Sequence, residues 1–264
     1  MANFTFNGFS VHYEDIGSGE ALLLLNGIFM SCDSWIGFIP ALSKNNRLLL
    51  LDFVDQGKSD KASTDYDISM QADLIEAFLN ELGLETVNLA GVSYGGQVAI
   101  IFAASRPERV KKLFLANTTS YTSKWLLDIG KSWIYSFESY DSHQFFKTCI
   151  PVVYSPKYYE SHYEWALERE AAFGLLFTPA IYDAFGRLTR SAECYDERDK
   201  LAKITSPSFV VSSTYDFITP PFQQRELAEM IPNAALVNIE DAGHASMYEK
   251  PDVFTELLLG FINT

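Results

Sequence analysis

The sequence has few basic residues and no long hydrophobic run, and both absences restrict what the chain can bind. Lysine and arginine number 20 against 34 aspartate and glutamate residues, which gives a formal net charge of −14 over 264 residues. Because no basic excess offsets repulsion from phosphate groups, we expect no nucleic-acid partner. The longest apolar runs, such as residues 21–25, are far shorter than the roughly 20 residues that cross a bilayer, so we expect no membrane insertion.

Cysteine is scarce as well, and no metal-binding spacing is present. Cys32, Cys149 and Cys194 are odd in number and widely spaced, which fits reduced thiols better than a disulfide framework. The four histidines are scattered, so we expect no metal. The first residues contain no basic stretch followed by an apolar one, so we expect no secretory signal and a cytoplasmic location.

The most informative segment is Gly91-Val92-Ser93-Tyr94-Gly95, which lies between an apolar strand-like run at 87–90 and an apolar helix-like run at 97–104. A serine flanked by glycines at a sharp strand-to-helix turn is typical of a nucleophile elbow. A bare G-x-S-x-G arises by chance in roughly one chain in twenty of this length. The strand-turn-helix context makes an ordinary glycine-rich turn the weaker interpretation, and the rest of the chain must decide between the two.

Strand and helix signals alternate along most of the chain, which predicts a mostly parallel sheet with helices on both faces. The apolar residues of 68–82 recur at helical spacing, and Gly83 follows as a stop signal. The expected strands are residues 9–14, 21–25, 47–52, 87–90, 110–116, 208–212 and 235–239. The expected later helices are residues 222–230 and 253–262.

Residues 118–197 break this alternation, because they look helical and are rich in aromatic side chains. Of the 38 Phe, Tyr and Trp residues, 17 lie between Tyr121 and Phe185. We therefore expect a core domain made of residues 1–117 and 198–264, with 118–197 inserted as a helical lid. The aromatic residues could simply form the core of the lid, but a lid this apolar also predicts an apolar pocket.

The serine needs a base and a third group that orients the base. In a sheet of this kind the chain order is Ser, then Asp or Glu, then His. Asp216 follows the strand at 208–212, and His244 follows the strand at 235–239, so all three side chains lie in loops after strands. The sequence predicts Ser93 as nucleophile, His244 as base and Asp216 as the orienting acid.

Other carboxylates could take the place of Asp216. Asp55, Glu240 and Asp241 also lie in loops, and Asn117 follows the strand after the elbow helix, where some such enzymes place the acid. An asparagine carries no charge, which favours Asp216.

The tetrahedral intermediate needs two N–H donors for its oxyanion. We expect them to be the backbone amides of Tyr94, directly after the nucleophile, and of Ile28, in the turn after the strand at 21–25. The side chains of both residues are expected to shape the pocket. The candidate pocket residues are Asn26, Gly27, Phe29, Trp125, Trp133, Phe137 and Phe217.

Taken together, these motifs resemble the α/β-hydrolase superfamily over essentially the whole chain. The resemblance implies an α/β fold with an eight-stranded, mostly parallel sheet, and it implies an enzyme that needs no cofactor. Two segments depart from the family pattern. The usual His-Gly of the oxyanion turn is Asn26-Gly27 here, and the usual Arg-Gly-x-Gly-x-Ser is Asp55-Gln56-Gly57-Lys58-Ser59. The Asn-Gly variant resembles some lactonase-like members and the hydroxyacyl transferases that build rhamnolipid precursors.

The function expected from this resemblance is a serine hydrolase of a carboxylic ester or lactone with an apolar acyl or alcohol part. Acyl transfer to an acceptor other than water, cofactor-free C–C bond hydrolysis and peroxyacid formation stay open, because the same triad performs each of them. A ligand-binding receptor on the same scaffold is the weakest alternative. We expect a small-molecule substrate as partner, and a homodimer stays open as an assembly.

Overall fold

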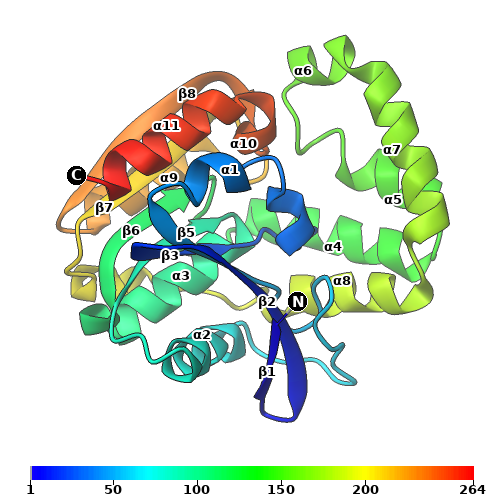
Figure 1. Cartoon of the computed structure of the whole chain (residues 1–264). Coiled ribbons are helices and arrows are strands. Elements are labelled where there is room, and N and C mark those ends of the chain that lie inside the picture. The colour runs from blue at the N-terminus through cyan, green and yellow to red at the C-terminus, as the bar shows by residue number, and fades with distance from the viewer. Residues whose placement is uncertain (1) are drawn as a thin grey trace.

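The computed structural model describes residues 2–264, which form an eight-stranded sheet flanked by helices (Figure 1). The strand order is β1-β2-β4-β3-β5-β6-β7-β8; β2 pairs antiparallel with β1 and with β4, and the other neighbours pair parallel. The strands are β1 (Ala2–Phe6), β2 (Phe9–Gly17), β3 (Glu20–Leu25), β4 (Asn46–Leu51), β5 (Val87–Val92), β6 (Val110–Ala116), β7 (Ser208–Tyr215) and β8 (Ala234–Gly243). The expected α/β-hydrolase fold with its mostly parallel sheet is confirmed.

The central strands are buried on both faces, as their continuous apolar runs predict. Leu22 to Leu25 of β3 and Leu48 to Leu51 of β4 have no exposed surface. The edge strand β1 was not identified from the sequence, because it is short and only half buried. A signal was present nonetheless: Asn7-Gly8 has positive φ at both residues, 49° and 86°, which is the dipeptide and geometry of a tight hairpin turn.

Helices on the two sides of the sheet position the loops at its carboxyl edge. They are α1 (Ile39–Leu42), α2 (Ser69–Glu81), α3 (Tyr94–Ser105), α9 (Pro221–Met230), α10 (Ser246–Glu249) and α11 (Pro251–Ile262), with short 3₁₀ turns η1 (Cys32–Trp35), η2 (Pro107–Arg109) and η3 (Arg198–Lys203). α3 is buried over all but its last residue, so its position is fixed by contacts all around it. None of the helices within residues 2–264 combines the length and apolar character that a bilayer crossing requires.

Five helices lie between β6 and β7 and form a separate group beside the sheet, coloured green to yellow in Figure 1. They are α4 (Lys124–Glu138), α5 (Ser142–Cys149), α6 (Pro156–Ser161), α7 (Tyr163–Leu176) and α8 (Pro179–Ser191). We call them the inserted helices. Tyr121 and Asp196 form an isolated antiparallel bridge, so the chain enters and leaves this group at adjacent points. The division into domains at 118 and 197 stays a prediction.

Candidate active site

Ser93 lies on a strained turn between β5 and α3, and the flanking glycines make that turn possible. Its φ of 53° and ψ of −118° are unusual for a residue with a side chain. A Cβ on Gly91 would lie 2.5 Å from the carbonyl oxygen of Gly95, and a Cβ on Gly95 would lie 2.6 Å from that of Leu25. Since backbone atoms cannot yield at such distances, only glycine fits at either position, as the elbow motif predicts.

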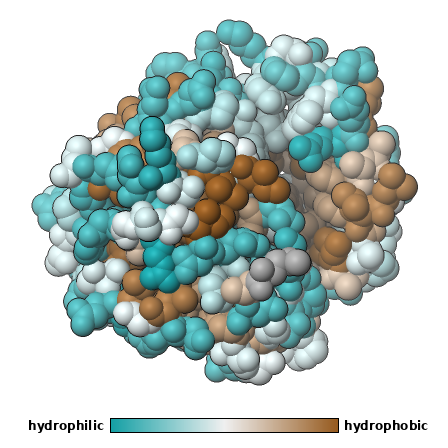
Figure 2. Space-filling view, viewed as in Figure 1, coloured by the Kyte–Doolittle hydropathy of each residue, from teal (hydrophilic) through white to brown (hydrophobic). Residues whose placement is uncertain are grey.

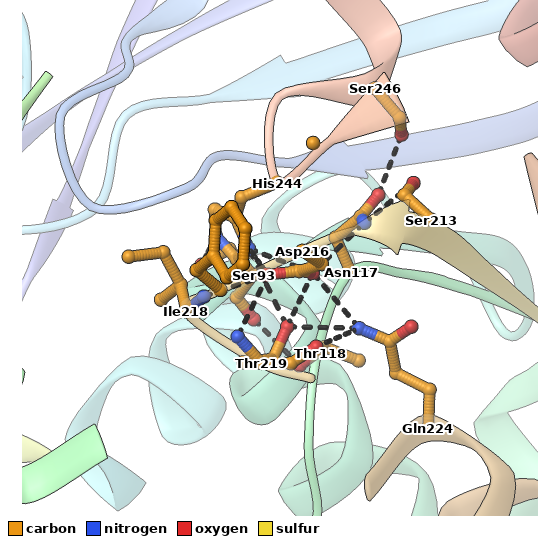
Figure 3. A network of polar contacts seen from close by, with 12 residues as sticks. Ser93, Asn117, Thr118, Ser213, Asp216, Ile218, Thr219, Gln224, His244 and Ser246 are labelled. Carbon is orange, nitrogen blue, oxygen red and sulfur yellow. Dashed lines mark hydrogen bonds and ion pairs between the residues drawn. The ribbon is translucent and has the colours of Figure 1, made fainter. Parts of the chain in front are cut away.

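The structure brings Ser93, His244 and Asp216 into one hydrogen-bonded chain (Figure 3). The Oγ of Ser93 lies 2.8 Å from Nε2 of His244, and Nδ1 of His244 lies 2.9 Å and 3.0 Å from the two carboxylate oxygens of Asp216. These residues come from the loops after β5, β8 and β7. A serine hydroxyl bonded to an imidazole that is itself held by a carboxylate is the arrangement that can activate an oxygen nucleophile.

Asp216 is held as a carboxylate although it is fully buried. Burial raises the pKa of this carboxyl, but the adjacent His244 and the hydrogen bonds that it receives outweigh burial and hold the pKa of Asp216 below its usual value. Besides His244, the donors are the backbone amides of Ile218 and Thr219 and the side chains of Asn117, Thr219 and Gln224. A carboxylate fixed from so many directions can fix the orientation of the imidazole.

The other carboxylates considered for this role have different partners. Asp55 accepts a bidentate ion pair from Arg187 of α8, with contacts of 2.7–3.3 Å. Glu240 accepts from Thr214, and Asp241 pairs with Lys157. Asn117 belongs to the triad network as a donor, with its Nδ2 3.0 Å from Asp216 Oδ2.

The turn after β3 is fixed from behind by polar side chains. Asn26 is fully buried and donates to the carbonyl of Leu51 at 2.9 Å, and its own side-chain oxygen accepts the indole N–H of Trp35 at 2.8 Å. Gln56 donates to the carbonyl of Gly27 at 2.9 Å. Asn26 and Gln56, which lie in the two segments that depart from the family pattern, contact each other at 3.2 Å and brace the same turn.

The two amides expected to hold an oxyanion are free to do so. Within residues 2–264, neither the N–H of Ile28 nor that of Tyr94 donates to a protein acceptor, and Tyr94 is the first residue of α3, where an N–H has no partner inside the helix. Their role stays a prediction. The side chain of Tyr94 is directed toward the inserted helices, since its hydroxyl contacts Ser191 of α8 at 2.9 Å.

A cavity of about 780 Å³ opens above Ser93 and His244, between the sheet edge and the inserted helices. Figure 2 shows apolar surface on both sides of the recess at this place. Gly27, Phe29 and Trp133 border the cavity, in agreement with their expected positions. Most of its wall is aromatic or aliphatic, and its polar side chains include Ser93, His244 and the charged Asp33, Asp55, Lys61 and Arg169.

Four residues expected in this pocket lie elsewhere, and the expectation was wrong for them. Asn26 is buried behind the turn. Phe137 is 2% exposed and packs inside the insertion against Phe29. Trp125 and Phe217 are more than 40% exposed and contact each other, because the Trp125 indole donates to the Phe217 carbonyl.

Other residues that line the cavity were not singled out as pocket residues. Phe145 comes from α5, Phe185 from α8 and Phe177 from the link between α7 and α8, and Met247 and Tyr248 come from α10, directly after His244. The aromatic richness of 118–197 was the only sequence signal for the first group. Position directly after His244, the expected base, was a usable signal for the second.

The loop that carries His244 is joined to the inserted helices. The buried carboxylate of Glu249, in α10, accepts the backbone amides of Gly243 at 3.0 Å and of Ser155 at 2.7 Å, and it accepts the Ser155 hydroxyl. Ala245 donates its amide to Val153 at 2.9 Å. Glu249 therefore ties the histidine loop to the segment between α5 and α6.

His12, Cys32 and Asp52 are buried with ligand atoms within 4.8 Å of one another, and we tested whether they fit a metal. Both ring nitrogens of His12 already contact side chains, and Asp52 accepts the amides of Cys32 and Lys58. Burial and the nearby Asp52 raise the pKa of the Cys32 thiol well above its usual range, which disfavours the thiolate that a metal binds. This group does not fit a metal.

A mostly parallel sheet, a nucleophile elbow after β5 and a Ser-His-Asp chain at the carboxyl edge define the class of α/β-hydrolase enzymes. The chain belongs to that family: the family model described as alpha/beta hydrolase fold matches residues 20–251. It is an enzyme of this fold.

Three relatives match over nearly their full length. The crystal structure of MGS-M2, an alpha/beta hydrolase enzyme from a Medee basin deep-sea metagenome library, is 39% identical with a TM-score of 0.98 and covers 100% of this chain and 98% of that one. The “Putative carbamate hydrolase RutD” of Azorhizobium caulinodans is 27% identical over 95% of this chain and 94% of its own. The pimeloyl-[acyl-carrier protein] methyl ester esterase of Nitrosomonas europaea is 27% identical over 93% and 96%.

Proposed function

We propose that the chain is a serine hydrolase that cleaves a carboxylic ester or lactone with an apolar part through an acyl-enzyme on Ser93. The observation that carries this proposal is the 2.8 Å contact between Ser93 Oγ and His244 Nε2, with Asp216 on the other ring nitrogen. The names of the relatives, which include an ester hydrolase, and the apolar cavity above Ser93 support it.

The proposed reaction begins when Ser93 Oγ attacks the acyl carbon and His244 takes its proton. The oxyanion accepts the amides of Ile28 and Tyr94, and losing one such donor typically raises the barrier by roughly 3 kcal/mol. His244 then gives its proton to the leaving alcohol oxygen as the C–O bond breaks. Water, deprotonated by His244, attacks the acyl-enzyme, and the acid leaves as Ser93 regains its proton.

The test combines turnover with covalent labelling. Wild type and Ser93→Ala are assayed on p-nitrophenyl esters from acetate to decanoate, and both are incubated with a fluorophosphonate and weighed by mass spectrometry. We expect ester turnover and the mass of one phosphonyl group for wild type only. Ser34→Ala is the matched control, since Ser34 borders the same cavity, and it should still be labelled. A wild type that neither turns over an ester nor is labelled would contradict the proposal.

A further inference from the structure

Ser93 borders a second, much smaller cavity, which His244 does not border. It holds about 60 Å³ and lies between the start of α3 and the helices α4 and α8. Ser93, Ile28 and Trp133 border both cavities, so these residues stand between them. The site above the serine therefore has two compartments, and their volumes differ by more than tenfold.

The volume of the small cavity limits what enters it. At about 60 Å³ it offers less than a tenth of the room of the large cavity, so it favours a short group. The large cavity holds about 780 Å³ and has a mostly apolar wall. An ester bound across Ser93 would therefore have a short group on one side of its carbonyl and a bulky apolar group on the other.

The position of His244 indicates which cavity would hold the acyl group and which would hold the alcohol. The leaving alcohol oxygen must receive its proton from His244 Nε2, and His244 borders the large cavity but not the small one. Both expected oxyanion donors, Ile28 and Tyr94, border the small cavity, next to where a carbonyl carbon and its short substituent would lie. The alcohol part is thereby assigned to the large cavity.

We infer that the preferred substrates are short-chain acyl esters, acetates or propionates, of a bulky apolar alcohol. This inference rests on the proposed hydrolase function and specifies its substrate. Ser93 Oγ forms a bond to the acetyl or propionyl carbon, the bond from that carbon to the alcohol oxygen breaks, and the proton of Ser93 passes through His244 to the alcohol. Water then releases the short acid.

Gly130 lies at the wall of the small cavity, where α4 and α8 pack closely. It lies within α4, where glycine costs about 1 kcal/mol relative to alanine, and its φ is not positive. A Cβ there would lie 3.2 Å from Cγ2 of Thr189, which also borders the small cavity. The glycine therefore lets the two helices approach, and an alanine would press against Thr189.

The experiment uses two isomeric esters whose alkyl leaving groups have similar reactivity. In 2-(2-naphthyl)ethyl acetate the bulky group is on the alcohol, and in methyl 3-(2-naphthyl)propanoate it is on the acid. We expect kcat/KM of the wild type to be at least about tenfold higher for the acetate, in line with the 10- to 200-fold that one methylene group can decide. Equal rates, or a preference for the methyl ester, would overturn the inference.

Variants of the cavity walls sharpen the test. Leu127→Ala enlarges the small cavity and should raise the ratio of kcat/KM for the butanoate over the acetate of 2-(2-naphthyl)ethanol about tenfold. Leu176→Ala makes the same deletion in the large cavity and should leave this ratio unchanged. Gly130→Ala should lower the ratio. A ratio that Leu127→Ala leaves unchanged, or that both leucine variants move equally, would contradict a separate acyl compartment.

Failure of the inference can be distinguished from failure of the hydrolase function. A wild type that is labelled at Ser93 and hydrolyses the methyl ester as fast as the acetate keeps the function and loses the inference. A wild type without labelling or turnover loses both.

Discussion

The sheet edge and the inserted helices are each stabilised by a different kind of interaction. At the edge, Asp216 alone receives hydrogen bonds from His244 and from four other residues. In the insertion, the buried ring of Phe145 packs against six other aromatic rings, those of Phe29, Phe137, Phe173, Phe177, Tyr182 and Phe185. Directional hydrogen bonds fix the positions of the proposed triad, whereas the non-directional packing of aromatic rings fixes the shape of the cavity above it. Substitutions at the sheet edge should therefore mainly lower activity, whereas substitutions in the inserted helices should mainly lower stability.

The largest expected effect is on activity and comes from Asp216→Asn. The amide has the same shape, so the fold should persist, but it cannot stabilise an imidazolium and it favours the wrong tautomer of His244. We expect kcat to fall by about 10⁴, as carboxylate-to-amide changes in such triads do.

The measurement is kcat on the best ester, with circular dichroism to confirm folding. Asp241→Asn is the matched control, because this carboxylate of β8, next to Glu240, pairs with Lys157 on the surface and should change kcat less than twofold. A kcat for Asp216→Asn within tenfold of wild type would show that another group orients His244.

The next effect is on stability and comes from Phe145→Ala. Phe145 has no exposed surface, and removing a buried phenylalanine ring typically costs about 3–5 kcal/mol through lost burial and the cavity left behind. The free energy of unfolding in urea measures the loss. Tyr135→Ala, at a side chain of α4 that is 67% exposed, should change stability by less than about 0.5 kcal/mol. Similar values for the two variants would argue against an aromatic core in the insertion.

The third effect is expected at Glu249, where the two regions meet. Glu249→Met would leave the buried amides of Gly243 and Ser155 without their acceptor, at about 1–3 kcal/mol each. Glu249→Gln keeps an oxygen that can accept both amides, so it should retain most of the stability and of kcat/KM. Urea unfolding and ester kinetics of the pair test this. Equal losses of stability and of kcat/KM in both variants would show that the negative charge of Glu249 matters here, rather than its hydrogen bonds to the two amides.

The sequence predicted the sheet, and it identified three side chains that the structure brings together at the sheet edge, because both depend on local pattern. The burial of β3 and β4 is indicated by their own leucine runs. The sharp turn at Ser93 is indicated by the glycines on either side of it. The order of Ser93, Asp216 and His244 along the chain then limited the choice of partners.

The pocket wall was harder to predict, since it depends on contacts between distant residues. Phe137 and Phe145 are both aromatic residues of the insertion, yet only Phe145 borders the cavity, and the sequence alone does not distinguish them. Asn26 was misplaced for the same reason. Its neighbour in the chain lines the pocket, while its own side chain turns back toward Trp35 and Gln56.

The bridge between Tyr121 and Asp196 has a consequence for how such a chain can change over evolutionary time. Because the two ends of the intervening segment lie side by side, a segment of different length or sequence could be joined at the same points without moving β6 or β7. Closing such a loop costs little more when it grows, since the entropic penalty rises only with the logarithm of its length. The segment between the two bridge residues can thus be replaced as a unit. Such a replacement would change the substrates that fit the cavity, while Ser93, Asp216 and His244 keep their positions.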